Sequence, residues 1–445
     1  MVSQTLAMAL VASCALVKAV PHAARAAPSN SSTSPNSSAY ALIAHYTGAD
    51  FFNHFTAFTG PDPTNGFVVY QDLKSAAEQK LVGYIFDEAT NKTSAYMGVD
   101  HTTKNPTPGR NSVRLLGKDK FDAGSMAVID INHIPVATGL WPAIWMLGTP
   151  PDGQTWPIAG ESDILEYVHE DVNNAMTLHT APGCTVDNTT SLFQGALVDA
   201  NCNAGDKIPA TTGCSIKAFN NNTIGIKTYA TAGPSFNKDA GAVYVHDWQP
   251  DSITVWMFPH SHVPADLAAG TPTPATWTQK PLAKFSGTGC DYTTAFAQMY
   301  LILNLDFCGD WAGHVWESSG AAKKTGVATC NEYVANHPEV YKDSYFDIAS
   351  VKFYSNNGQN ASGLAKRHEE EETAVEIPTT VQTGGGGDVR MPSNATDNGN
   401  GSYPFNHHKR IIAPGVEPAT SEASTAETAG WLVAAGMFAA LAFAL

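Results

Sequence analysis

The stretch ESDILE, residues Glu161–Glu166, places three carboxylates within six positions of a segment that is otherwise poor in acids and rich in aromatic residues. In a β-strand alternate side chains share a face, so Glu161 and Asp163 point the same way and Glu166 points the opposite way. A β-bulge between Asp163 and Glu166 would shift the register by one residue and return Glu166 to the face of the other acids. We therefore predict a bulged strand with three carboxylates in a row. The alternative is a half-exposed strand that carries unrelated acids.

The spacing of such a row suits a particular acid chemistry. Alternate strand residues lie roughly 6.5 to 7 Å apart at the backbone. Their side chains can lean together to the separation of about 5 to 5.5 Å between carboxyl groups that retaining glycoside hydrolysis uses.

Tryptophans lie close to these acids in the sequence. The run GLWPAIWML, residues 139–147, contains Trp141 and Trp145, and Trp156 follows after a loop rich in proline and glycine. Aromatic faces stack on the apolar faces of sugar rings, so we predict that Trp141 and Trp145 bind substrate. The alternative is that the alternation in this run buries a tryptophan in the core.

Four motifs in this order resemble the fungal laminarinase-type branch of glycoside hydrolase family 16. They are ESDILE, GLWPAIW, NAMTLHT (residues 174–180) and FCGDWAG (residues 307–313), and the resemblance spans residues 40–355. It implies an all-β fold, a β-jelly-roll sandwich of the concanavalin A-like type whose concave sheet carries the substrate groove.

The strand pattern of the chain agrees with that fold. Short β-prone runs alternate with Gly, Pro and Asn, and few segments show a helical period, which is typical of an antiparallel sandwich. The runs are residues 67–70, 112–116, 126–131, 242–248, 252–258, 299–305 and 347–354.

The resemblance also implies roles for the three acids. Glu161 corresponds to the nucleophile and Glu166 to the general acid and base, because one carboxylate attacks the anomeric carbon while the other protonates the leaving oxygen. Asp163 lies between them and is expected to hydrogen-bond one glutamate and to separate their pKa values, because close negative charges resist simultaneous ionisation. Ser162 departs from the apolar residue usual in the family, and it should face away from the substrate.

Three further residues are predicted to contact substrate. The resemblance places His179 beside the carboxylates, although a lone histidine is otherwise a structural hydrogen-bonding group. Trp311 is expected to help close the sugar cleft, with a loop tryptophan that caps the core as the alternative. Arg114 would reach the groove unless it is a solvated or paired charge.

The predicted activity is that of an endo-1,3(4)-β-glucanase. The extra residue in the ExDxxE spacing is the form of laminarinase-like members, whereas lichenases and wall transglycosylases of the family generally use ExDxE. Two alternatives stay open: a cell-wall β-glucan transglycosylase, and a non-catalytic glucan-binding protein on the same fold.

Composition limits the partners. The chain has 445 residues, with 41 acidic against 25 basic side chains and a net charge of −16. This charge argues against nucleic acid and polyanionic substrates but is compatible with a neutral polymer such as β-glucan. We expect a monomer with no cofactor. We expect no metal site either, because the cysteines lack CxxC spacing.

The two ends of the chain predict export and anchoring. Residues 1–26 resemble a signal peptide, and residues 27–39 a disordered lead-in to a catalytic domain over residues 40–357. Residues 358–428 form a predicted disordered stalk, and residues 429–445 an apolar tail that is removed when a glycosylphosphatidylinositol anchor is attached at Ser421 or Ser424. A tail-anchoring transmembrane helix is the alternative. The expected location is the outer face of the plasma membrane, with the cell wall as the other possibility.

Cysteines and sequons fit an exported protein. Cys14 leaves with the signal peptide, and the other six cysteines predict three disulfides among fifteen possible pairings. Predicted N-glycosylation sites are Asn30, Asn36, Asn91, Asn188, Asn221, Asn360, Asn394 and Asn400.

Overall fold

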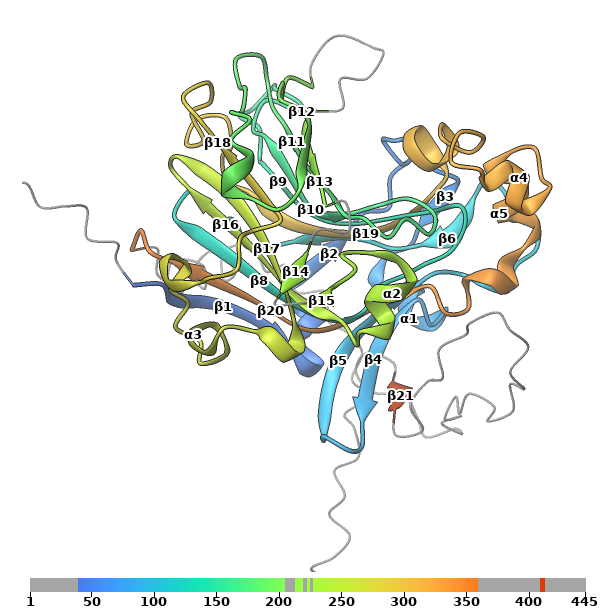
Figure 1. The fold of residues 1–445 in the computed structure, drawn as a ribbon. Helices are drawn as coiled ribbons and strands as arrows, with labels where there is room; N and C mark the ends of the chain where they lie inside the picture. Colours follow the sequence, from blue (N-terminus) through green and yellow to red (C-terminus); the bar gives the residue numbers. More distant parts are fainter. Residues whose placement is uncertain (1–38, 205–212, 219–221, 225–226, 359–408, 413–445) are drawn as a thin grey trace, which may run out of the picture. The chain divides into compact units, whose positions relative to one another are not determined.

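Two large antiparallel β-sheets stack on one another in the computed structural model, which describes residues 39–204, 213–218, 222–224, 227–358 and 409–412 (Figure 1). The first sheet has nine strands. Its order is β18 (Ala283–Ser286), β17 (Ser252–Pro259), β16 (Ala242–Gln249), β8 (Ser125–His133), β20 (Tyr345–Ser355), β5 (Lys92–Gly98), β4 (Val82–Asp87) and β21 (Lys409–Ile412), and β1 (Ala41–Thr47) also pairs with β20.

The second sheet carries the predicted catalytic strand. Its order is β12 (Ala196–Asp199), β13 (Cys214–Lys217), β11 (Ala175–His179), β10 (Glu161–Glu166), β9 (Leu140–Leu147), β19 (Tyr300–Phe307), β7 (Arg114–Gly117) and β2 (Phe55–Ala57). Two short pairs lie outside both sheets: β14 (Thr223–Ile224) with β15 (Lys227–Thr228), and β3 (Val68–Tyr70) parallel to β6 (Arg110–Ser112).

Helices are short and lie in the connections between strands. The α-helices are α1 (Leu73–Glu78), α2 (Gly233–Lys238), α3 (Ala265–Ala268), α4 (Ala321–Thr325) and α5 (Cys330–Asn336). Short helical segments of other types are η1 (Gly48–His54), η2 (Thr190–Leu192), η3 (His260–His262), η4 (Pro274–Thr276), the π-helical η5 (Gly309–Gly313) and η6 (Pro338–Tyr341). Among the described residues, none of these helices has the length and apolar character that crossing a bilayer needs.

The predicted β-sandwich is confirmed, and each of the seven β-prone runs lies mainly in strands. The run 112–116 is divided between β6 and β7 at Val113. The core lies between the sheets because alternate residues of each strand point inward, as do Ile144 and Met146 of β9 and Tyr244 and Trp248 of β16. Such burial of apolar surface is the main favourable term in folding.

Three disulfides are present, in the number that the cysteine count predicts. They join Cys184 to Cys290, Cys202 to Cys214, and Cys308 to Cys330. The pairing was open from the sequence and is decided by which strands and loops the fold brings together.

One predicted segment needs correction. Residues 358–428 were expected to lack regular structure throughout, yet Lys409–Ile412 forms β21 and pairs with β4. The physical reason is that β4 would otherwise be an edge strand with unpaired backbone groups, which readily accept a further strand.

Several predictions fall outside the described residues. Asn91 and Asn188 are described and are exposed to solvent, as glycosylation requires. The predictions that fall outside the described residues are the signal peptide, the apolar tail, the anchor sites Ser421 and Ser424, and the sequons at Asn30, Asn36, Asn221, Asn360, Asn394 and Asn400.

A polar pair crosses the core directly behind the predicted catalytic strand. Ser162 points into the sandwich, as expected, and its Oγ lies 3.0 Å from Nε2 of His246 in the opposite sheet. Both side chains are buried, and burial lowers the pKa of His246 to about 4. The imidazole is therefore neutral in the folded protein at neutral pH.

This burial predicts an acid-sensitive contribution to stability. The unfolded chain binds the proton of His246 below about pH 6.5, whereas the folded chain binds it only near pH 4, so stability falls as the pH drops through that window by about 3 kcal/mol in total. Between pH 7 and pH 4.5, the free energy of unfolding measured in urea should fall by about 2 kcal/mol less in His246→Gln than in the natural chain. The exposed control His314→Gln should lose as much as the natural chain, and an equal loss in all three proteins would contradict the assignment.

Candidate active site

A β-bulge in β10 brings the three acids onto one face of the sheet. Asp163 lies opposite Trp145 of β9, Leu165 lies opposite Ile144, and the register shifts between them because Ile164 is an extra residue. Ile164 and Leu165 are both fully buried in the core. Glu166 therefore leaves the sheet on the same side as Glu161 and Asp163, as the spacing predicted.

Asn174 supports the bulge from the strand connection that follows. Its Oδ1 accepts from the backbone N–H of Glu166 at 2.8 Å, and its Nδ2 donates to the carbonyl of Ile164 at 2.8 Å. The fully buried amide thus satisfies two backbone groups next to the irregular register. The sequence reasoning quoted Asn174 only as the first residue of a motif and did not predict this role.

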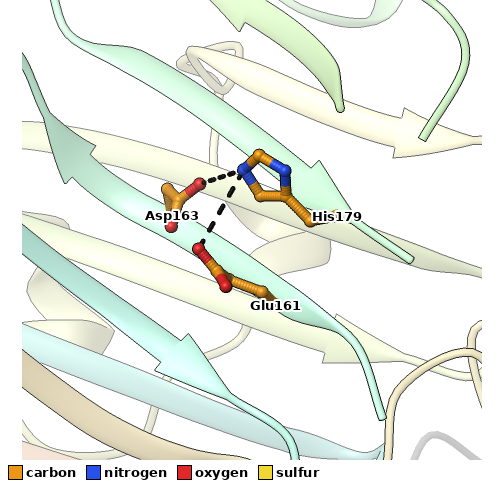
Figure 2. Close-up of side chains that lie close together, drawn as sticks. All are labelled: Glu161, Asp163 and His179. Carbon is orange, nitrogen blue, oxygen red and sulfur yellow. Dashed lines mark hydrogen bonds and ion pairs between the residues drawn. The ribbon is translucent and has the colours of Figure 1, made fainter. Parts of the chain in front are cut away.

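Figure 2 shows Glu161, Asp163 and His179 pointing toward one another from neighbouring strands. Nε2 of His179 lies 3.2 Å from Oδ2 of Asp163 and 4.0 Å from Oε1 of Glu161. The hydrogen-bond partner of Asp163 is thus His179, and not either glutamate as the sequence reasoning expected. The reason is that β11 lies next to β10 and places a histidine opposite Glu161.

His179 is a cation in this setting. Burial alone would lower its pKa, but the hydrogen bond to Asp163 and the charges of Glu161 and Asp163 outweigh burial and raise the pKa to about 9. An imidazolium beside two carboxylates stabilises their ionised forms.

The pKa of both glutamates is raised. Burial, followed by the charge of Asp163, raises the pKa of Glu161 to about 7, while His179 and an indole act in the opposite direction. The same two causes raise the pKa of Glu166 well above its usual range. Both carboxyl groups therefore hold a proton to a higher pH than an exposed glutamate does.

Each glutamate is held by one indole. Nε1 of Trp141 donates to Oε1 of Glu166 at 2.7 Å, and Nε1 of Trp156 donates to Oε2 of Glu161 at 2.5 Å. Trp156 is 49% exposed, so its ring is also open to a ligand. The sequence reasoning noted Trp156 near the acids but left it out of the predicted site, although its loop leads directly into β10.

Trp311 lies next to Trp141. The two rings meet edge to face with centroids 5.8 Å apart, and η5 carries Trp311. Both side chains are half-buried, so part of each remains accessible. Together they form a wall on the Glu166 side of the acids.

Trp145 and Arg114 lie on the same face but are mostly covered. Trp145 is only 8% exposed and donates to Oδ1 of Asn304 at 2.7 Å, so a ligand can reach little of its ring. The guanidinium of Arg114 lies 5.0 Å from the ring centre of Trp145 and 3.8 Å from Oδ1 of Asp62. The structure thus places Arg114 as a paired charge at the floor of the site.

One cluster of the described residues has the composition of a metal site. Glu161, Asp163 and His179 each offer a ligand atom, and these atoms lie within 4.8 Å of one another. The raised pKa of His179 keeps its nitrogen protonated, which works against coordination because a metal needs the neutral imidazole.

The chain matches the model of the XgeA-like catalytic domain of glycoside hydrolase family 16 over residues 55–354. A probable glycosidase of Schizosaccharomyces pombe is 34% identical over 316 residues, which cover 71% of this chain and 69% of that protein. The endo-1,3(4)-beta-glucanase xgeA of Emericella nidulans is 35% identical over 325 residues, which cover 72% of this chain and 48% of that protein. The chain thus spans about half the length of this second relative.

Two solved structures have a similar fold. Laminarinase 16A of Phanerochaete chrysosporium, solved with β-glucans in its donor and acceptor sites, is 34% identical, with a TM-score of 0.61 over 71% of this chain and 100% of that chain. An elongating β-1,3-glucosyltransferase of the same family is 33% identical, with the same TM-score and coverage.

The two indoles generate a paired prediction. Trp156→Phe removes a donor to the ionised form of Glu161 and should raise the pKa of Glu161 by about one unit, because a lost hydrogen bond of about 1 kcal/mol shifts a pKa by that amount. Trp141→Phe should raise the pKa of Glu166 instead. Carbon-13 NMR of labelled glutamate carboxyls measures both shifts. Each variant serves as the control for the other, and a shift of the wrong glutamate would contradict the geometry.

Proposed function

This chain belongs to glycoside hydrolase family 16, and from that membership we propose that it is a retaining endo-β-glucanase acting on β-1,3 bonds and on β-1,4 bonds in mixed-linkage glucans. The observation that carries the proposal is the bulged strand β10, which puts Glu161, Asp163 and Glu166 on one face with an indole bonded to each glutamate. Relatives at about 35% identity are endo-1,3(4)-β-glucanases by name, and the XgeA-like catalytic match makes the chain an enzyme.

In the first step the ionised carboxylate of Glu161 attacks the anomeric carbon. Protonated Glu166 gives its proton to the leaving sugar oxygen as the glycosidic bond breaks, which leaves a covalent ester on Glu161. In the second step Glu166, now a carboxylate, takes a proton from water, and that water displaces Glu161 from the anomeric carbon. Two displacements retain the configuration of the sugar, and Glu166 ends protonated again.

The surroundings of the two glutamates support this division of roles. Burial and the charge of Asp163 raise the pKa of Glu166 well above its usual range, and a general acid needs to keep its proton. His179 and Trp156 favour the ionised nucleophile by placing a positive charge and an N–H donor beside Glu161. The proposed part of Asp163 is to hold His179 in place and, through its negative charge, to raise the pKa of Glu166.

A transglycosylase is the second candidate, and one observation favours it. The structurally similar elongating β-1,3-glucosyltransferase is 33% identical to this chain, about as close as the laminarinase. The two activities share every step through the covalent intermediate and differ only in whether water or a sugar hydroxyl receives the glycosyl group. The geometry of the three acids therefore does not separate them.

Product analysis tests the proposal. The protein produced from the full chain should release short reducing oligosaccharides from laminarin and mixed-linkage glucan, with the β-anomer formed first in proton NMR. Glu161→Gln and Glu166→Gln should lower the rate at least about 10³-fold. Asp163→Asn should lower the rate less and shift the pH profile. Products longer than the donor would favour the transglycosylase, and equal small effects of all three substitutions would contradict the assignment.

We further propose that the enzyme acts at the outer face of the plasma membrane, held there by a lipid anchor. Three disulfides among the described residues are typical of an oxidising compartment, and exposed Asn91 and Asn188 fit glycosylation there. Phosphatidylinositol-specific phospholipase C should release the activity from intact cells, and replacement of both Ser421 and Ser424 by Leu should send it into the medium. Activity that stays with the membrane after both treatments would contradict the anchor.

A further inference from the structure

Two buried carboxyl groups lie next to each other beyond the catalytic acids. The side chain of Asp62, in the loop before β3, is 2% exposed, and Asp306 near the end of β19 is 1% exposed. Asp306 lies opposite Trp141 in the sheet, so it leaves the same face as that indole. The hydroxyl of Thr64 lies between the two acids.

The hydrogen bonds of Thr64 indicate which of Asp62 and Asp306 carries a proton. Oγ1 of Thr64 lies 2.6 Å from Oδ2 of Asp62 and 3.1 Å from Oδ2 of Asp306. A hydroxyl carries a single proton, and the shorter contact shows that Thr64 donates it to Asp62. Oδ2 of Asp62 also accepts the backbone N–H groups of Thr64 and Gly66, as an ionised carboxylate does. The longer contact is a hydrogen bond only if Asp306 supplies its own proton to Thr64.

We propose that Asp306 is a protonated carboxylic acid and a positioning residue, whose proton completes a hydrogen-bond chain from Asp306 through Thr64 to Asp62. This hydrogen-bond chain would hold the loop that contains Asp62 and Gly66 against the wall formed by Trp141 and Trp311. The proposal rests on the proposed function, because it concerns how that wall is kept in place for a sugar.

The surroundings favour one proton on the pair. Arg114 lies 3.8 Å from Oδ1 of Asp62 and balances one negative charge, so a second carboxylate would leave a net charge buried. Tyr70 also faces the pair, and burial together with Asp306 and Asp62 raises the pKa of its hydroxyl well above the usual range, so it stays neutral. Burial and the charge of Asp62 likewise raise the pKa of Asp306 well above its usual range.

The loop is fitted closely around Asp306. A Cβ at Gly66 would lie 1.9 Å from Oδ1 of Asp306, so this position leaves room for glycine alone. Oδ1 of Asp306 also accepts the backbone N–H of Phe307 at 2.6 Å. Both oxygens of Asp306 therefore have assigned partners, one as acceptor and one as donor.

Contacts continue from this loop to the tryptophan wall. The carbonyl of Thr64 accepts from the backbone N–H of Asp310 at 2.9 Å, and Asn65 donates to the carboxylate of Asp310. A Cβ at Gly309 would lie 2.7 Å from the carbonyl of Thr64 and 3.3 Å from the ring of Trp141. A shift of the loop would thus displace η5 together with Trp311. It would also displace Trp141, which donates a hydrogen bond to Glu166.

Isosteric amides test the assignment because the two acids are predicted to respond differently. In Asp306→Asn, the amide nitrogen donates to Thr64 while the amide oxygen accepts from Phe307, so the variant imitates the protonated acid. In Asp62→Asn, an NH2 group replaces one carboxylate oxygen. It then faces either the three donors at Oδ2 or the guanidinium of Arg114 at Oδ1, and neither can accept a hydrogen bond from it. We expect binding of a laminari-oligosaccharide, measured by calorimetry in a Glu161→Gln background, to weaken about tenfold for Asp62→Asn and less than about twofold for Asp306→Asn.

A pH comparison isolates the proton of Asp306. In the Glu161→Gln background, binding should be about tenfold weaker at a high pH at which Asp306 is ionised, and the hydrogen-bond chain is broken, than at a low pH at which Asp306 is protonated. Adding Asp306→Asn should remove that part of the pH dependence. The titration of His179 and Glu166 affects binding equally in both proteins, so it does not contribute to the difference between them. Thr64→Val, which removes the link but keeps both acids, should bind weakly at both pH values. Equal pH dependence with and without Asp306→Asn would overturn the proposal.

Infrared spectroscopy gives a readout that needs no substrate. The natural chain at neutral pH should show a carboxylic-acid C=O band that disappears in Asp306→Asn and persists in Asp62→Asn. Absence of that difference, or failure of Asp306→Asn to fold, would overturn the proposal. If no glucan is bound or cleaved by the natural chain, the proposed function fails, and the infrared difference still decides the protonation of Asp306.

Discussion

The site depends on one extra residue in β10. Ile164 and Leu165 both turn into the core, so the strand loses its alternation for one step and Glu166 joins the face of Glu161 and Asp163. Two buried side chains in succession hold the bulge from the inside, and the amide of Asn174 satisfies its backbone from the side. Without this irregularity the proposed acid and nucleophile would lie on opposite faces of the sheet.

A second constraint is the unequal environment of carboxylates that lie close together. Burial and the charge of Asp163 raise the pKa of both glutamates, while His179 and one indole at each glutamate, Trp156 or Trp141, act in the opposite direction. The balance between these effects sets the pKa of each carboxyl group. His179 comes from β11, which pairs with β10 in the sheet. Trp156 comes from the loop that precedes β10 in the sequence.

Residues beyond the acids position the wall of the site. Cys308 and Cys330 join the start of η5 to α5, and η5 presents Trp311 to Trp141. The carbonyl of Thr64 also accepts from the backbone N–H of Asp310 in η5. The wall therefore combines segments from three distant parts of the chain, and its accuracy depends on long-range contacts.

The sequence alone determined the strand class and the need for a bulge, because side-chain alternation and the odd spacing of ESDILE follow from local backbone geometry. It also singled out His179 and Trp141 near the acids, through motifs rather than through contacts. Only the tertiary structure decided the disulfide pairing, the indole donor to Glu161, the bond of Asp163 to His179, and the strand β21 inside a predicted stalk. These features join residues whose proximity depends on sheet order and loop packing, which local periodicity does not encode.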